Sequence, residues 1–533
     1  MSKILVTDAI ASEGIELLGS KAEVDVKRGL TPPELTETIN GYDALVVRSE
    51  TKVTPEVIRA GQSLRVIARA GIGVDNINID AATSAGIPVV NAPIGNTVAA
   101  AEHTLALMLA LARNVPQAYQ SFKAGEWKRS AFMGIEVRDK TLGIVGLGRV
   151  GSEVARRARA FGMNLVGFDP FISPDHAERM GVELMSVDDL LACSDFITLH
   201  TPLTDSTNGL IGERELKLVK PGARLINVAR GELINDKALL DALNNDQLAA
   251  AALDVFVQEP PADMSLVQHP RVIPTPHLGA STEEAQREVA IEAAEQVLAI
   301  LEGRPARNTV NAPVLPPDVH AILEPYIPVA TLLGKLLINL TDDQLVGVTV
   351  SYEGEIAEYD TTILKSAVLE GLLSTVSSEE VNIINAPLLA QSRGLRITEQ
   401  KDTVANEFTS LITVAVKTTK GEVTLAGTSL RNEPHIVKFN DYWMDVEPSA
   451  PYLLIVDNPD HPGSIGAVGT VAGEHNINIS YMKVGRLSQR GTAMMVLGLD
   501  DPVPEKVLDQ IRGLPQVSSA RLVKLYGNWL GPE

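Results

Sequence analysis

Short apolar runs alternate with amphipathic segments of helical spacing over the first 93 residues of the chain. The runs cover residues 4–6, 22–26, 44–47, 65–68 and 88–90. The helical segments between them begin near Ser12, Pro32, Pro55 and Asp80. This alternation is typical of βα units, so it predicts a doubly wound parallel sheet whose ligands lie beyond the carboxyl ends of its strands.

A second series of the same kind follows a long Ala/Leu-rich helix predicted for residues 98–113 and a further helical piece that ends near residue 127. Its predicted strands cover residues 142–145, 164–168, 196–200, 223–228, 249–254 and 272–275, and a helix is predicted at 283–302. We therefore expect a second doubly wound sheet. His103 lies inside the long helix, where we expect it to make a packing or polar contact rather than to act as a catalyst.

The first strand of the second series runs into a glycine-rich turn. Gly146, Gly148 and Gly151 occupy the three glycine positions of the dinucleotide fingerprint, which permit a tight turn, approach of a pyrophosphate and close packing of helix on strand. Asp169 follows the next strand, 18 positions after Gly151, near the spacing of the acid that binds a ribose diol. A carboxylate there would repel a 2′-phosphate, so NAD is favoured over NADP. A simple cap or turn at Asp169 is the alternative.

Three residues with complementary chemistry follow three successive strands of this second series. Arg230 suits a carboxylate, His277 suits a hydroxyl proton near neutral pH, and Glu259 suits the protonated imidazole. The carboxyl ends of parallel strands meet at one edge of a sheet, beside the expected nicotinamide. Together the three residues predict oxidation of a 2-hydroxy acid, whereas each alone could be structural.

Length and charge limit the partners. The 533 residues suggest three or four domains, and the formal net charge of −21 argues against nucleic acid and anionic membranes. An anionic substrate would need local cations, for which Arg48 and Arg69 at strand ends are candidates, with surface salt bridges as the alternative.

The single cysteine, Cys193, excludes an intrachain disulfide and a cysteine-based metal site, and we expect no metal. We see neither a signal-peptide core nor a membrane-spanning run and expect a cytoplasmic protein.

Several motifs together resemble one family. They are the glycine turn with Asp169, His200-Thr-Pro202, Asn227-Val-Ala-Arg230-Gly231, the stretch 252–260, and Pro276-His277-Leu-Gly-Ala280. The pattern resembles the D-isomer-specific 2-hydroxyacid dehydrogenases, and the resemblance covers the whole chain. It implies NAD as the cofactor and Arg230, Glu259 and His277 as the catalytic residues.

The resemblance also implies two sets of binding residues. The cofactor would contact Gly146, Gly148, Arg149, Val150, Gly151, Asp169, Thr201, Pro202, Thr207, Ala229, Arg230, Asp254, His277, Gly279 and Ala280. The substrate would contact Arg48, Arg69, Gly71, Asn96, Arg230 and His277, and Lys128 or Arg129 of a neighbouring subunit could complete a phosphate pocket. A discontinuous substrate-binding domain, residues 1–97 with 283–312, would accompany a Rossmann domain at 98–282.

The pattern changes after residue 312. A helix predicted at 326–340 and β-like segments at 345–350, 412–416 and 422–425 indicate an α+β domain over residues 313–450. This region resembles the intervening domain of long members of the family, which is associated with allosteric control and anion binding. The candidates for an anion are Lys417, Arg431, His435 and Lys438, although a solvated charged face is the preferred interpretation.

Residues 451–533 show the order of a ferredoxin-like unit. Strands predicted at 453–456, 477–484, 493–499 and 520–525, with helices at 464–474 and 504–512, give βαββαβ. The segments 460–465 and 476–479 resemble an ACT domain, a module that binds amino acids, often across paired subunits. Asp460, Gly463 and Asn478 are therefore candidates to bind L-serine as an effector, and a pure dimer contact is the alternative.

The resemblance implies NAD-dependent oxidation of 3-phospho-D-glycerate to 3-phosphohydroxypyruvate, the first step of the phosphorylated route to L-serine, with reduction of 2-oxoglutarate as a side activity. A dehydrogenase of another D-2-hydroxy acid, such as glycerate, and an NAD(H)-sensing binding protein are the alternatives. The long helix after Asn96 and the ACT unit both favour a homo-oligomer, either a dimer or a tetramer.

Overall fold

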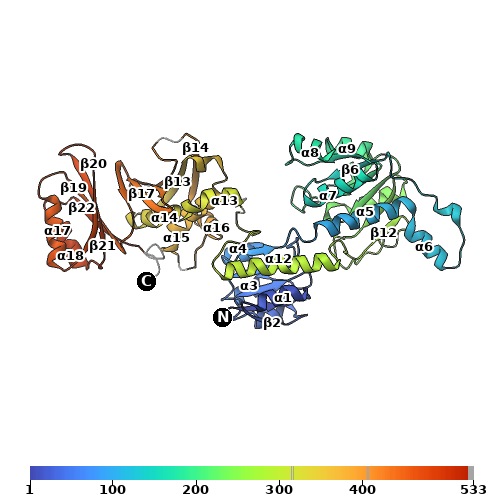
Figure 1. Cartoon of the computed structure of the whole chain (residues 1–533), viewed down its shortest axis with the longest axis horizontal. Helices are drawn as coiled ribbons and strands as arrows, with labels where there is room; N and C mark the ends of the chain where they lie inside the picture. Colours follow the sequence, from blue (N-terminus) through green and yellow to red (C-terminus); the bar gives the residue numbers. More distant parts are fainter. Residues whose placement is uncertain (314, 316, 342, 378, 405–406, 526–533) are drawn as a thin grey trace.

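The computed structural model describes residues 1–313, 315, 317–341, 343–377, 379–404 and 407–525. In this part of the chain four sheets form along an elongated molecule, with the sheet that contains β6 toward one end and the sheet that contains β19 at the other (Figure 1). The first sheet lies between them, close to the N-terminus. The predicted fold class, two doubly wound parallel sheets followed by two α+β units, is confirmed.

The first sheet is parallel, with strand order β2-β1-β3-β4-β5. Its strands are β1 (Lys3–Val6), β2 (Glu23–Val26), β3 (Ala44–Val47), β4 (Val66–Arg69) and β5 (Val89–Asn91), and its helices are α1 (Ser12–Gly19), α2 (Pro32–Thr38), α3 (Pro55–Ala60) and α4 (Ile79–Ser84). Successive residues of one strand enter different cores, because Ile4 and Val6 pack on one face and Leu5 on the other. Burial on both faces explains why these strands are apolar without interruption.

Helix α12 (Glu283–Leu301) packs on this first sheet although it follows the second sheet in the chain. Its residues Val289, Ala290 and Ala293 belong to the core that also holds Ile4. A Cβ at Gly14 of α1 would lie 2.7 Å from the Ala290 carbonyl oxygen, so the glycine lets α1 and α12 approach closely. The chain therefore crosses between the two sheets twice.

The second sheet is also parallel, with order β12-β11-β10-β9-β6-β7-β8. Its strands are β6 (Thr141–Val145), β7 (Asn164–Phe168), β8 (Glu183–Leu184), β9 (Phe196–Leu199), β10 (Ala223–Asn227), β11 (Leu248–Leu253) and β12 (Val272–Pro274). Its helices are α5 (Thr97–Arg113), α6 (Val115–Lys123), α7 (Arg149–Ala160), α8 (Pro174–Met180), α9 (Val187–Cys193), α10 (Glu213–Leu218) and α11 (Asp236–Asn244). Short β8 was not predicted, since two residues carry no periodic signal.

The third sheet is mixed, with order β14-β13-β15-β16-β17-β18. Its strands are β13 (Leu345–Gly354), β14 (Arg396–Asp402), β15 (Ser410–Thr418), β16 (Glu422–Leu430), β17 (Glu433–Phe439) and β18 (Tyr442–Val446). Helices α13 (Pro317–Leu323), α14 (Ile327–Leu340), α15 (Thr362–Ser374) and α16 (Ala386–Ser392) accompany it. The segment Val319–Leu340 is long and apolar enough to cross a membrane, but half of it is buried, and the α14 side chains that cause this character lie in the core.

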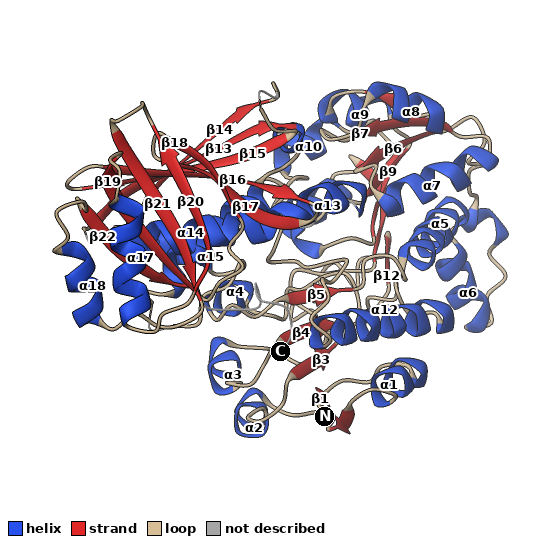
Figure 2. Cartoon of the chain, turned by 60° about the vertical axis from the view of Figure 1, so that its left-hand side comes forward, coloured by secondary structure: helices blue, strands red, loops and turns tan. Residues whose placement is uncertain are grey.

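The fourth sheet is antiparallel, with order β20-β21-β19-β22. It contains β19 (Tyr452–Pro459), β20 (Ile479–Arg486), β21 (Thr492–Leu499) and β22 (Ser519–Lys524), and α17 (Ser464–Glu474) and α18 (Glu505–Arg512) cover one face. Residues of the opposite face, such as Leu453 and Val496, enter the core of the third sheet. Strands β18 and β20 accordingly run side by side (Figure 2). The two C-terminal units thus share one core, which the sequence did not indicate.

Candidate active site

The glycine-rich turn joins β6 to α7. A Cβ at Gly151 would overlap the carbonyl oxygen of Gly146, and Gly146 itself has φ of 95° with the backbone of His200 against its Cβ position. Gly148 is different, because a Cβ there would meet open space. It is the N-cap of α7 and contributes no side-chain cap, so the N–H groups of the first turn remain for an anion. This arrangement fits a bound pyrophosphate.

Other predicted cofactor residues lie around the turn. Asp169, just after β7, accepts hydrogen bonds from the N–H of Leu147 and of Phe171, both at 2.9 Å, so it ties the turn to the next strand. The buried Oγ1 of Thr201 has no hydrogen-bond partner among the described residues. A buried hydroxyl without a partner is costly, which fits a partner supplied by the cofactor. The Thr207 hydroxyl instead donates to the carbonyl of Pro202 at 2.7 Å within its own loop.

His277 and Glu259 form a hydrogen-bonded pair. His277 Nδ1 lies 2.7 Å from Glu259 Oε2, and Glu259 Oε1 accepts the Phe256 N–H at 3.1 Å. Partial burial alone would raise the pKa of Glu259, but the hydrogen bond and charge of His277 outweigh it and hold that pKa below its usual value. An ionised Glu259 keeps a proton on Nδ1, which leaves Nε2 to exchange a proton with a substrate.

Asp254 lies behind His277 and is fully buried. Its Oδ1 accepts from Thr275 Oγ1 at 2.6 Å and from the Leu278 N–H at 2.7 Å, and its Oδ2 accepts from the Gly279 N–H at 2.8 Å. Burial would raise the pKa of Asp254, but hydrogen bonds from His103, Thr275 and Leu278 hold it below its usual value. Asp254 therefore organises the turn that carries His277, and His103 makes the polar contact expected of it.

Arginines from both parallel sheets meet across the space between them. Arg230, which follows β10, donates from Nη1 to the Ala229 carbonyl at 2.7 Å, and its Nε lies 3.2 Å from Asp75 Oδ2 of the first sheet's loop. The Nη2 atom of Arg230 overlaps the position that a Cβ at Gly73 would take, so the guanidinium can approach this loop only because residue 73 is a glycine. Burial and the charge of Arg230 lower the pKa of Arg69 to about 10, with a smaller contribution from Arg48. The arginine remains protonated at neutral pH, so Arg48, Arg69 and Arg230 form one cluster of cations, and Asp75 and Asp8 lie close enough to act on it.

Among the described residues, one buried polar atom of this arginine cluster and two at the start of α5 lack a hydrogen-bond partner. Arg69 Nε, Asn96 Oδ1 and Thr97 Oγ1 are buried without a hydrogen bond among the described residues. Asn76 holds the Arg48 loop, because its Nδ2 donates to the Arg48 and Thr51 carbonyls, both at 2.7 Å. Such a set fits an anionic substrate that would supply acceptors for the arginine. Asp75 and Asn76, which contact Arg230 and the Arg48 loop, were not predicted, since nothing in their spacing indicates these contacts.

The structure separates the three candidate effector residues. Asp460 and Gly463 follow β19, near Thr492 at the start of β21, whereas Asn478 precedes β20, near Leu499 at the end of β21. Asp460 Oδ2 accepts the Arg490 N–H at 2.9 Å, and Gly463, with φ of 96°, opens α17 without a side-chain cap. Within one chain they cannot form a single site.

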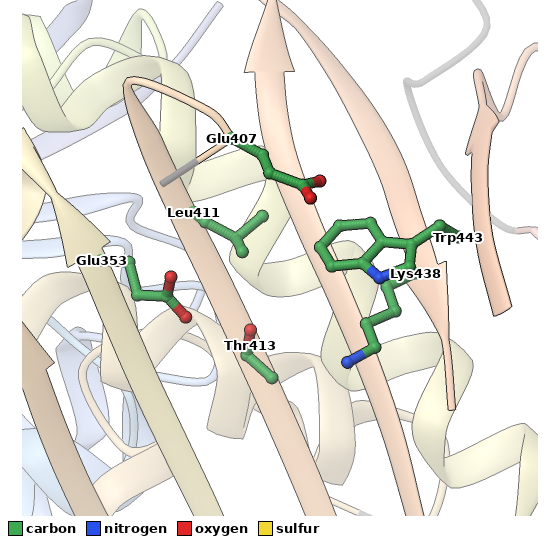
Figure 3. A pocket seen from close by; sticks show the side chains of 6 residues that line it. All are labelled: Glu353, Glu407, Leu411, Thr413, Lys438 and Trp443. Carbon is green, nitrogen blue, oxygen red and sulfur yellow. The ribbon is translucent and has the colours of Figure 1, made fainter. Parts of the chain in front are cut away.

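The four candidate anion residues of the third sheet also lie apart. Lys417 and Arg431 lie at opposite ends of β16, and His435 pairs with Asp445 at 2.6 Å. Lys438 lines a small pocket of about 150 Å³ and stands 5.2 Å from the ring centre of Trp443 (Figure 3). Glu353 and Glu407 line the same pocket, which therefore lacks the excess positive charge of an anion site.

The fold, the paired His277 and Glu259, and Arg230 at the end of a neighbouring strand define an NAD-dependent dehydrogenase of 2-hydroxy acids. Three family models match the chain. The D-isomer specific 2-hydroxyacid dehydrogenase NAD binding domain matches residues 105–279, the D-3-phosphoglycerate dehydrogenase intervening domain matches 322–440, and the ACT domain matches 452–516.

Proteins similar over the full length are D-3-phosphoglycerate dehydrogenases. The chain is 46% identical to that of Synechocystis sp. over 98% of this chain and 95% of the relative, and 44% identical to that of Methanocaldococcus jannaschii over 98% and 100%. A solved structure, the TT0316 protein from Thermus thermophilus, is 36% identical with a TM-score of 0.54 and covers 58% of this chain and 99% of its own. The chain belongs to the D-3-phosphoglycerate dehydrogenase family.

Proposed function

We propose that this protein oxidises 3-phospho-D-glycerate to 3-phosphohydroxypyruvate. The observation that carries the proposal is the hydrogen-bonded pair of His277 and Glu259 at the same sheet edge as Arg230, which belongs to a cluster with Arg48 and Arg69. A base next to several cations suits a hydroxy acid that carries two anionic groups. The matching intervening and ACT units extend the likeness to the whole chain.

In the oxidation, His277 Nε2 accepts the proton of the C2 hydroxyl group while Glu259 stabilises the imidazolium that forms. Arg230 binds the substrate carboxylate and holds C2 in front of the nicotinamide. NAD, when bound, supplies the hydride acceptor. The open space over Gly148 and the Thr201 hydroxyl fit that cofactor. In the reverse direction the protonated His277 returns its proton to the carbonyl oxygen.

Arg48 and Arg69 of the first sheet bind the phosphate in this proposal. They follow β3 and end β4 of the first sheet, whereas the NAD-binding turn belongs to the second, so a substrate would touch both sheets. The distal phosphate thereby links the two sheets while the reacting carbon stays near His277. Asp169 at the ribose end supports NAD rather than NADP as cofactor.

The test is the rate of NADH oxidation with 3-phosphohydroxypyruvate, hydroxypyruvate and 2-oxoglutarate. A preference of about a hundredfold or more in kcat/KM for the phosphorylated compound is expected, because paired arginines add charge-assisted hydrogen bonds to a phosphate. Equal rates with hydroxypyruvate would contradict the assignment of the arginine pocket. The folded variants His277→Ala and Arg230→Ala should lose most turnover.

The protruding arm after α5 supports a homo-oligomer. It presents several exposed apolar side chains, Val115, Tyr119, Phe122, Trp127 and Met133, of which Trp127 is 76% and Met133 83% exposed. Exposed apolar patches of this kind mark interaction surfaces. A second copy that covers the arm would bring Lys128 or Arg129 toward its neighbour's phosphate pocket. Light scattering of wild type and Phe122→Ser would test this, with a monomer expected for the variant.

L-Serine is the proposed effector of the C-terminal unit. Because Asn478 lies at the opposite end of the sheet from Asp460 and Gly463, a serine site needs Asn478 of the partner subunit. Serine should therefore bind to the oligomer, and Asp460→Ala and Asn478→Ala should each abolish binding in calorimetry.

We also place the enzyme in the cytoplasm and assign it four domains with the boundaries expected above.

A further inference from the structure

His103 is a second histidine close to the catalytic turn, and it comes from a different part of the chain than His277. It lies on α5, the helix that carries the chain from the first parallel sheet onto the second. Its ring nitrogen Nε2 lies 3.1 Å from Asp254 Oδ1 and 3.2 Å from Thr275 Oγ1, and its side chain is 19% exposed.

The hydrogen-bond pattern fixes the role of each group. The Thr275 hydroxyl donates its hydrogen to Asp254 Oδ1 at 2.6 Å, so that hydroxyl can only accept from His103. The carboxylate of Asp254 is likewise an acceptor. His103 Nε2 therefore carries a hydrogen and donates it to this pair.

Asp254 passes this restraint to the catalytic base. Its carboxylate accepts the N–H groups of Leu278 and Gly279, and its carbonyl accepts the His277 N–H at 2.8 Å. These bonds enclose His277, which adopts φ of 54°, a left-handed conformation unfavourable for a residue with a side chain. A turn in that conformation depends on surrounding bonds to hold it.

We propose that His103 is a positioning residue for the general base: through Nε2 it donates to the buried Asp254, which in turn holds the turn that carries His277. The inference rests on the proposed function only in that His277 is the base. It adds a residue that acts on the base through Asp254. It also places the interdomain helix α5 in the chain of contacts behind the reacting atoms.

Two amide side chains test the proposal because they differ in reach. His103→Gln can place an amide N–H near the position of Nε2, whereas the shorter His103→Asn cannot. Loss of a hydrogen bond to a buried charge should lower kcat of His103→Asn by about tenfold to a hundredfold, while His103→Gln stays within about threefold of wild type. KM and the NADH dissociation constant, measured by fluorescence, should change little in either. His176→Gln on the exposed face of α8 is the matched control.

A second variant guards against misfolding of His103→Asn. Thr275→Val removes the other side-chain donor to Asp254 Oδ1 and keeps the volume, so it should lower kcat in the same way. Equal kcat for His103→Gln and His103→Asn, with unchanged melting temperatures, would overturn the proposal, as would wild-type kcat in Thr275→Val. If wild type prefers another 2-oxo acid, the proposed substrate fails, and the same variants are then compared on that acid.

Discussion

Replacing Glu259 by glutamine removes one negative charge from the proposed catalytic pair, His277 and Glu259, and keeps the shape of the side chain. The carboxylate Oε2 lies 2.7 Å from His277 Nδ1. Because the pKa of Glu259 is held below its usual value, the group is ionised throughout the neutral range, and its charge is present whenever His277 gains a proton. The variant should therefore lose part of the electrostatic stabilisation of the transition state, in oxidation and in reduction alike.

The size of the effect follows from the distance and the exposure. Both side chains are more than a third exposed, so an effective dielectric constant of about 40 is appropriate, and two unit charges at this separation then attract by about 3 kcal/mol. Screening by water and salt reduces this to about 2 kcal/mol, which corresponds to a fall of about 30-fold in kcat/KM. The remaining hydrogen bond of the amide would keep the ring in place.

The assay is NADH oxidation by 3-phosphohydroxypyruvate as a function of pH. Reduction uses the protonated imidazole, which the carboxylate stabilises, so in Glu259→Gln the pH at which reduction falls to half should move toward acid. Glu178→Gln on the exposed surface of α8 serves as the matched control. An unchanged pH profile with a loss below about threefold would refute the assignment of Glu259 as the partner of the base.

Three further predictions concern the cofactor, the substrate and the stability. Gly151→Ala places a methyl group against the Gly146 carbonyl and should lower the melting temperature, whereas Gly148→Ala, in open space, should leave it unchanged and weaken NADH binding by about tenfold or more, as calorimetry would show. Equal effects of the two would contradict the pyrophosphate site. Arg69→Met should raise KM for 3-phosphohydroxypyruvate by about a hundredfold and KM for hydroxypyruvate much less; a parallel rise would assign Arg69 to the carboxylate instead. Burial lowers the pKa of His200 to about 4. Because this lies below the unfolded value near 6.5, the stabilisation from the neutral ring is complete above about pH 6.5 and is lost as the pH falls toward 4. His200→Gln should therefore reduce the acid-induced loss of unfolding free energy by about 2 kcal/mol, a value lowered because His200 is only partly buried. Denaturant unfolding measured at several pH values tests this, and an unchanged pH dependence in the variant would contradict it.

The parallel sheets could be predicted because their strands are buried on both faces and therefore apolar throughout. The same reasoning missed β14, whose residues Arg396–Asp402 are largely exposed and charged, and α15, whose apolar residues surround the helix and show no single face. In the site, the sequence correctly predicted that Arg230 and His277 follow strands of the same parallel sheet and therefore lie at the same edge. Asp75 could not be predicted because its ion pair with Arg230 joins the loops of two different sheets, and no motif or periodicity in the sequence indicates such a contact. The separation of Asn478 from Asp460 depends on which end of a strand each one borders, which only the register shows.

The return of α12 to the first sheet has a consequence for synthesis of the protein on the ribosome. The strands of that sheet are complete at Asn91, but part of its core, including Val289 and Ala293, is translated roughly 200 residues later. At about 5–20 residues per second, the unfinished sheet waits roughly 10–40 s with an apolar face uncovered. A nascent chain released at residue 97 should aggregate, and chaperones that bind apolar segments should associate with the growing chain until residue 301 has emerged.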